Sequence, residues 1–130
     1  MPVYNDRLFS PAAPVVIAKI RNPKTADVQS DVLMLIDSGA DLTLLPRFSV
    51  ESLGIERSGS SYELMGFDGT TSVSDTVWAE LLFLGKIYRG QFLLIDQEIG
   101  ILGRNILNQV CLVLDGPRLI WEERAPIKDS

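Results

Sequence analysis

Short apolar segments alternate with polar turns along most of the chain. Each apolar segment is shorter than a typical buried helix, and turn signals such as Asn22-Pro23 and Asp115-Gly116-Pro117 separate them. This spacing predicts an all-β domain. The strand-like segments are Val15–Ile20, Asp31–Ile36, Leu42–Leu45, Tyr62–Met65, Thr71–Val77, Trp78–Leu84, Ile87–Ile95, Ile99–Leu102, Val110–Leu114 and Arg118–Glu122.

Helical and irregular segments occupy less of the chain. One or two helical turns are predicted over Phe48–Leu53, with Gly54 as the stop, and a short helix over Asn105–Gln109. The polar runs Arg21–Ser30 and Arg57–Ser61 are predicted to be loops. The pattern divides the chain into an extended arm at 1–14, one domain at 15–122 and a loose tail at 123–130.

Composition and charge exclude several classes of protein. The sequence has 12 Lys and Arg against 17 Asp and Glu, a net charge of −5, with no cluster of basic residues. Nucleic acids and anionic membranes are therefore poor partners. No apolar run approaches the ~18–20 residues of a membrane span, and no signal-peptide pattern opens the sequence. We expect a soluble, cytoplasmic protein.

The absence of histidine restricts the possible chemistry. It excludes Ser-His-Asp and Cys-His catalysis and histidine-based zinc sites, and no other metal-ligand spacing is recognisable. We expect neither a metal nor a cofactor. Cys111, the one cysteine, lies in an apolar segment and is predicted to be a buried core thiol, or a residue of a dimer seam if the chain dimerises.

Asp37-Ser38-Gly39 follows a buried apolar run and has two interpretations. Asp, Ser and Gly are turn residues, so the triplet alone favours a simple turn at the end of a strand. Alternatively, the turn holds a catalytic carboxylate. Two such carboxylates placed close together share one proton, so the pair acts on a water and on a substrate carbonyl without histidine.

Three segments that occur in a particular order favour the catalytic interpretation over a simple turn. The run Val32–Pro46 resembles the catalytic loop of aspartic proteases, and Glu98–Gln109 resembles the Gly-Arg-Asn segment and following helix of retroviral proteases. Between them, the glycine-bearing hairpin Tyr62–Thr76 occupies the position of the flap. The resemblance spans Val15 to Trp121. It implies a retropepsin-like aspartic endopeptidase, folded as a closed acid-protease β-barrel with one short C-terminal helix and a flap hairpin.

The resemblance also implies residue roles. Asp37 matches the catalytic carboxylate, and Ser38 and Gly39 support its loop. Arg104 matches a structural buttress that makes a buried, bidentate pair with Asp41; the alternative is an exposed arginine at a helix start. The expected substrate-binding residues are Gly39, Ala40, Asp41, Met65, Gly66, Phe67, Ile101 and Leu102.

One such triplet in the chain implies a homodimer acting on a polypeptide, because the second Asp37 must come from another copy. The segment Asp115–Glu122 extends beyond the viral pattern and resembles cellular retropepsin-like domains, so Val110–Trp121 is expected at the dimer interface. Trp121 could equally be a core aromatic.

Two other hypotheses stay open. The flap tip, Gly66-Phe67-Asp68-Gly69, has fewer glycines than viral flaps, which leaves room for a weak or inactive dimer that binds extended peptides. The more distant alternative is an unrelated β-sandwich, with Asp37 on the surface of a monomer.

Overall fold

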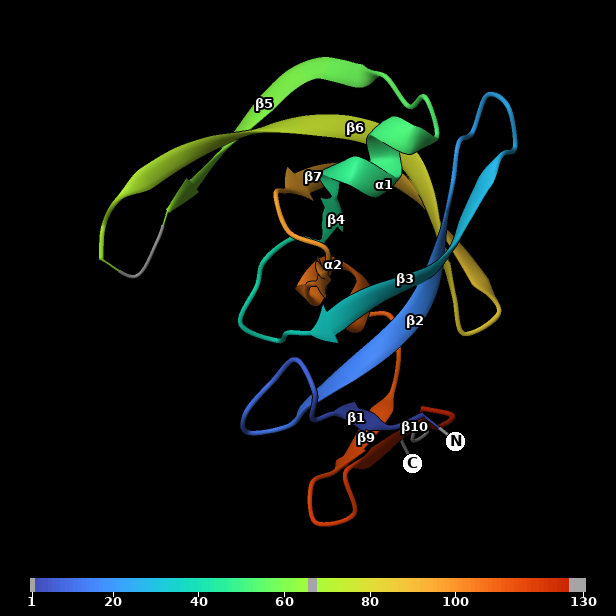
Figure 1. Cartoon of the computed structure of the whole chain (residues 1–130), viewed down its shortest axis with the longest axis vertical. Coiled ribbons are helices and arrows are strands. Elements are labelled where there is room, and N and C mark those ends of the chain that lie inside the picture. Colours follow the sequence, from blue (N-terminus) through green and yellow to red (C-terminus); the bar gives the residue numbers. More distant parts are fainter. Residues whose placement is uncertain (1, 66–67, 127–130) are drawn as a thin grey trace.

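The computed structural model describes residues 2–65 and 68–126. Its regular structure there is mostly β-strand, with two short helices (Figure 1). The elements in order are β1 (Tyr4–Asn5), β2 (Ala13–Arg21), β3 (Val28–Ile36), β4 (Leu44–Pro46), α1 (Arg47–Ser52), β5 (Arg57–Met65), β6 (Thr71–Phe83), β7 (Lys86–Ile95), β8 (Gly100–Leu102), α2 (Arg104–Leu107), β9 (Leu112–Asp115) and β10 (Ile120–Glu123). The all-β prediction is confirmed.

One large sheet dominates the fold. Its strand order is β1-β2-β3-β8-β4-β7-β6-β5, and a further pairing of β2 with β6 brings the sheet back onto itself. Most neighbours are antiparallel, but β3 pairs with β8 and β4 pairs with β7 in parallel. The parallel pair β3–β8 sets the end of β3 beside the start of α2, two segments far apart in sequence.

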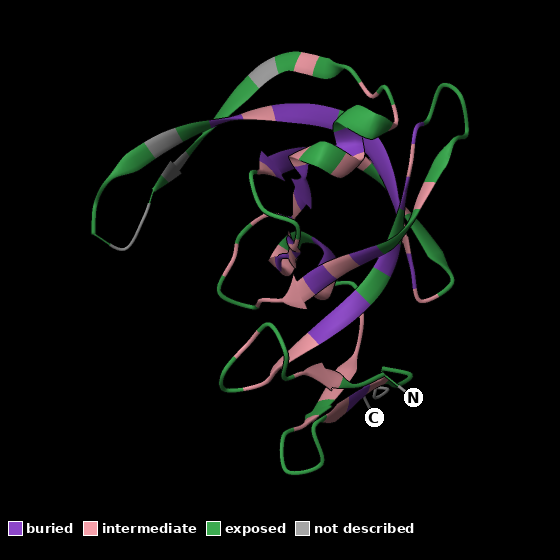
Figure 2. Cartoon of the chain, in the orientation of Figure 1, coloured by how far each residue is buried: buried purple, intermediate pink, exposed green. Residues whose placement is uncertain are grey.

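Strand β2 illustrates how the sequence selects this sheet. Successive side chains of a strand point to opposite faces, and in β2 Val16, Ala18 and Ile20 are buried while Ile17 and Lys19 are exposed. The buried residues of β2, β3, β6 and β7 belong to one apolar core, and Figure 2 colours the buried parts of these strands purple. Helix α1 adds Val50 to this core and α2 adds Ile106.

Three sequence predictions of local structure were wrong. Residues 57–61 are not a loop but the first part of β5, and the predicted break between Val77 and Trp78 lies inside the continuous strand β6. Strand β3 begins at Val28, inside the predicted polar loop. In β3 and β5 the pairing with a neighbouring strand extends the strand through polar residues, which the hydrophobic pattern alone does not reveal, and in β6 the pairing with β7 runs unbroken from Thr76 to Phe83. The long strands β5 and β6 form the hairpin that projects from the body in Figure 1.

The C-terminal hairpin β9–β10 packs against the N-terminus of its own chain. Val3 forms a β-bridge with Ile120. Trp121 is 3% exposed, and its indole Nε1 donates a 2.8 Å hydrogen bond to the carbonyl of Val15. Trp121 is therefore a core residue of its own chain, one of the two roles expected for it. Cys111 is only partly buried, which corrects the prediction of a fully buried thiol.

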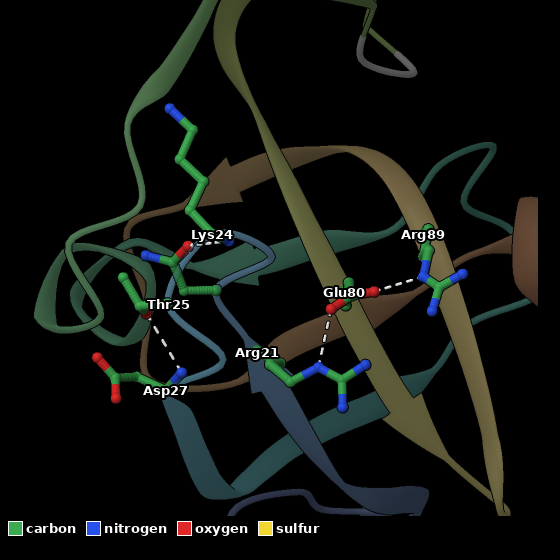
Figure 3. Close-up of polar contacts among 7 residues, drawn as sticks. Arg21, Lys24, Thr25, Asp27, Glu80 and Arg89 are labelled. Carbon is green, nitrogen blue, oxygen red and sulfur yellow. Dashed lines mark hydrogen bonds and ion pairs between the residues drawn. The ribbon is translucent and has the colours of Figure 1, made fainter.

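A buried charge joins three strands of the sheet. Glu80 on β6 accepts hydrogen bonds from Arg21 on β2 and from Arg89 on β7 (Figure 3). The Glu80 side chain is only 9% exposed, so the two guanidinium groups compensate most of its lost hydration. The hydrogen bond from Arg21, and then that from Arg89, lower the pKa of the Glu80 carboxyl below its ordinary value of 4.5.

The helices of residues 2–65 and 68–126 are all far too short to cross a lipid bilayer.

Candidate active site

Asp37 is the first residue after β3, in the loop that connects β3 to β4. Asp37 is half-buried, and its backbone N–H donates a 3.1 Å hydrogen bond to the carbonyl of Leu102. The loop turns sharply, since the N–H of Ala40 donates to the carbonyl of Asp37 at 3.2 Å. In Figure 1 this loop opens on the side toward which the β5–β6 hairpin projects.

Gly39 orients the Asp37 carboxylate. Its backbone N–H donates a 2.9 Å hydrogen bond to Oδ1 of Asp37. A Cβ at position 39 would lie 3.1 Å from the same oxygen, closer than most real Cβ contacts. A larger residue here would press on the carboxylate oxygen, which would have to shift by a few tenths of an ångström.

The start of α2 braces the loop through backbone contacts. The N–H groups of Arg104 and Asn105 donate to the carbonyls of Ala40 and Asp41, at 2.8 and 3.2 Å. Gly103 lies so close that a Cβ there would be 2.3 Å from the carbonyl oxygen of Leu42. No side chain fits between the two backbones, so glycine at position 103 is a steric requirement of the site.

The Arg104 guanidinium reaches the loop from outside. Nη1 donates to the carbonyl of Ser38 at 2.8 Å, and Nη2 donates to Oδ1 of Asp41 at 2.5 Å. The pair is exposed in the single chain, with 43% of the Arg104 side chain and 73% of the Asp41 side chain accessible. The expected pairing of these residues is present, but it is neither buried nor bidentate on the carboxylate.

A second connection, missed by the sequence predictions, lies in the interior. Thr43 is fully buried, and its hydroxyl donates to Oδ1 of Asn105 at 2.8 Å while accepting from the N–H of Gly103 at 3.1 Å. A threonine within the apolar run Leu42–Leu45 is a signal for this role, because a buried hydroxyl needs a partner.

The other predicted substrate-binding residues differ in exposure. Met65, at the end of β5, is 76% exposed, and Ile101 on β8 is partly exposed. Leu102 is fully buried in the core, which corrects its predicted role, since a side chain without accessible surface cannot contact a peptide. Gly66 and Phe67 lie outside the described residues.

Comparisons with known proteins agree with this geometry. Residues 16–106 match the family model described as aspartyl protease. The chain belongs to the aspartyl protease family. No curated protein matches the chain. The resemblance to retropepsin-like proteases is confirmed, and the family assignment makes the chain an aspartic-type peptide hydrolase.

Two solved structures have a similar fold. EIAV protease complexed with the inhibitor HBY-793 has a TM-score of 0.55 and 24% identity, over 75% of this chain and 86% of that chain. The protease of Simian Foamy Virus (mac) in solution has a TM-score of 0.52 and 17% identity, over 72% and 91% of the two chains. At these identities the likeness shows the fold of the aspartyl protease and no more.

The carboxylate of Asp37 does not line the cavity of about 690 Å³ that lies between α1 and the loop after β7. That cavity is bounded by Pro46, Arg47, Phe48, Ser49, Glu51, Ile95, Asp96, Gln97 and Glu98. Its Arg47 side chain pairs with Asp96 at 2.5 Å, which closes one wall. In the described chain, the Asp37 loop is therefore not part of this open depression.

Proposed function

We propose that the protein is a homodimeric aspartic endopeptidase in which Asp37 of each subunit activates one water between the two carboxylates. The observation that carries the proposal is a single Asp-Ser-Gly loop with a half-buried, glycine-oriented carboxylate in a chain of this family. One such carboxylate is half of an aspartic dyad, so a twofold axis beside Asp37 supplies the other half.

The chemistry follows from two carboxyl groups that hold one proton between them. The ionised carboxylate accepts a proton from the water as that water attacks the peptide carbonyl carbon. The protonated carboxyl group donates its proton toward the carbonyl oxygen, which gains negative charge as the tetrahedral intermediate forms. As the intermediate collapses, the carboxyl group that took the water's proton donates it to the amide nitrogen, the C–N bond breaks, and the diol returns one proton to the other carboxylate, which restores the shared proton.

The substrate is proposed to be an extended peptide beneath the β5–β6 hairpin. An extended strand presents alternate side chains to the two sides of a cleft. Gly39, Ala40 and Asp41 from the loop are proposed to contact its backbone, with Ile101 and Met65 near its side chains. These residues are accessible in the single chain, as such contacts require.

The outer edge of β9 supports a location for the dimer contact. Within residues 2–65 and 68–126, β9 pairs only with β10, and Leu114 on β9 is 51% exposed. An unpaired strand edge is a template for pairing with another chain. We propose that β9 edges from two copies meet within the predicted interface segment Val110–Trp121, where partly buried Cys111 directly precedes the strand.

The decisive experiment mixes active and inactive chains. Asp37→Asn is expected to abolish cleavage of a peptide library, and equal mixing with wild-type protein is expected to reduce activity per wild-type chain to about half, since random pairing places half of those chains with an inactive partner. Unchanged activity per wild-type chain would overturn the shared site. A dimer in analytical ultracentrifugation without any cleavage would instead support a peptide-binding role.

A second experiment tests the interface. Leu114→Asp is expected to shift the protein toward monomer and to lower its specific activity most at low concentration, because activity requires association. Phe48→Asp is the matched control, an exposed apolar residue on α1, 83% exposed and away from β9. Equal dimerisation of both variants would exclude the β9 edge as the contact.

A further inference from the structure

The loop of residues 37–43 contains no helix or strand, so neighbouring contacts must fix the position of its carboxylate. Those contacts come largely from one segment, Leu102–Asn105, at the end of β8 and the start of α2. The contacts differ in their exposure to solvent. Buried hydrogen bonds restrain the loop more strongly than exposed ion pairs do.

The Arg104–Asp41 contact is the more accessible one. Both side chains are substantially exposed in the chain, and exposed ion pairs are screened and gain little because two long side chains lose freedom. This contact orients the outer side of the loop. The ion pair with Asp41 is a weak restraint, and the 2.8 Å hydrogen bond from Nη1 to the Ser38 carbonyl is the direct hold of this half-exposed side chain on the backbone beside Asp37.

Thr43 provides a buried restraint at the other end of the loop. Its hydroxyl uses both of its capabilities, as acceptor from the N–H of Gly103 and as donor to Oδ1 of Asn105. The Thr43 carbonyl also accepts a 3.2 Å hydrogen bond from the N–H of Leu93 on β7. Thr43 therefore ties the loop to α2 and to the sheet at one point, with no exposed surface of its own.

Movement at Thr43 would be transmitted toward Asp37 through tightly packed backbone. Leu42, the preceding residue, lies against Gly103 with no space for a Cβ between them. The N–H of Arg104 holds the carbonyl of Ala40, and the N–H of Ala40 holds the carbonyl of Asp37. The path from the buried hydroxyl to the carboxylate thus consists of short, directional contacts.

We propose that Thr43 is a positioning residue of the catalytic site, whose hydroxyl fixes Gly103 and Asn105 and thereby holds the loop that presents Asp37. The proposal rests on the proposed function of Asp37. It assigns the main restraint to a buried hydroxyl, whereas the sequence pattern pointed to Arg104. The role concerns geometry, since Thr43 itself is too deeply buried to touch a substrate.

The test removes the hydroxyl without changing the shape of the side chain. Thr43→Val is expected to lower kcat about 10- to 100-fold with little change in KM, because a small displacement of a reacting group has effects of that size. Thr43→Ser keeps the hydroxyl and is expected to restore most of kcat. If Thr43→Val does not fold, Asn105→Ala is the second variant. Asn105 is exposed, and this change removes the oxygen that accepts the hydrogen bond from the Thr43 hydroxyl.

The matched control is Asn22→Ala, another buried polar side chain. Asn22 donates to the carbonyl of Leu53 and accepts from the N–H of Lys24, each at 2.9 Å, and touches no part of the 37–43 loop in these bonds. If Asn22→Ala is destabilised to the same extent as Thr43→Val but keeps its kcat, lost stability is not the cause of the lower kcat in Thr43→Val. Wild-type kcat in Thr43→Val, or equal losses in both variants, would overturn the proposal.

Amide hydrogen exchange gives a readout that needs no activity. In Thr43→Val the amides of Ala40, Gly103 and Arg104 are expected to exchange about tenfold faster relative to the core amide of Leu81, because local opening is favoured when a buried donor loses its acceptor. In Asn22→Ala their relative rates should stay unchanged. If the wild type cleaves no peptide, the proposed function fails and the exchange rates alone decide whether Thr43 holds the loop.

Discussion

Gly39 and Asp37 form a contact that constrains both residues: the glycine N–H donates to the carboxylate Oδ1 at 2.9 Å, and a Cβ on the glycine would lie 3.1 Å from that oxygen. The Gly39 N–H holds the Asp37 carboxylate on the same side on which a side chain at position 39 would push it away. Orientation of the reacting group thus depends on a hydrogen bond and on the absence of a side chain.

Gly39→Ala is therefore expected to lower kcat roughly tenfold, because the new methyl group displaces the Asp37 carboxylate by a few tenths of an ångström. Stability should change little, since Gly39 is exposed. Peptide cleavage kinetics and thermal unfolding measure the two effects. Glu51→Ala, an exposed substitution on α1, is the control and should leave both unchanged. Full activity of Gly39→Ala would show that the carboxylate adapts.

Gly103→Ala is expected to destabilise the protein and to abolish activity. Its Cβ would lie 2.3 Å from the Leu42 carbonyl oxygen, and backbone must shift to relieve the overlap. Overpacking of this kind costs about 1–3 kcal/mol of unfolding free energy. Urea unfolding against the Glu51→Ala control, an exposed substitution on α1, measures this cost. A variant with unchanged stability and activity would contradict the backbone contact between α2 and the catalytic loop.

Arg104→Lys tests whether Arg104 orients the Asp37 loop without contributing much to the free energy of unfolding. A lysine ammonium cannot hold the Ser38 carbonyl and the Asp41 carboxylate in the same fork geometry, so kcat/KM is expected to fall about tenfold. The unfolding free energy should change by less than about 1 kcal/mol, because the pair is exposed. Arg124→Lys, in a similarly exposed pair with Glu122, should alter neither quantity. A large loss of stability in Arg104→Lys alone would indicate that the pair is buried in the assembly.

The contribution of Glu80 to the free energy of unfolding depends on pH. Its pKa is lowered in the folded state by the hydrogen bonds from Arg21 and Arg89, so the stabilisation is present above the ordinary value of 4.5 and is lost as pH falls through the lowered value. Glu80→Gln is expected to be less stable than wild type near neutral pH, and the difference should shrink in acid. Chemical unfolding at several pH values measures this. A difference that stays constant with pH would contradict the ionic role of Glu80.

Much of the candidate site was readable from local sequence. Asp37-Ser38-Gly39 after an apolar run, and Gly103-Arg104-Asn105 at the start of a helix, carried the prediction because each is a contiguous run of residues that resembles a family motif. The parallel pairing of β3 with β8 explains why two segments so far apart act together. The first part of β5 was missed because polar residues become strand only when a partner strand is present.

The sequence by itself predicted the all-β character, because hydrophobic period and turn chemistry are local properties, and its motif resemblance pointed to the family and to Asp37 as the proposed catalytic carboxylate. Only the tertiary structure decided that Gly39 makes room for a carboxylate oxygen, that Leu102 and Trp121 belong to the core, and that the Arg104–Asp41 pair is exposed. It alone placed the buried hydroxyl of Thr43 against Gly103 and Asn105. Burial and hydrogen-bond partnership depend on which distant segments meet, and no local pattern contains that information.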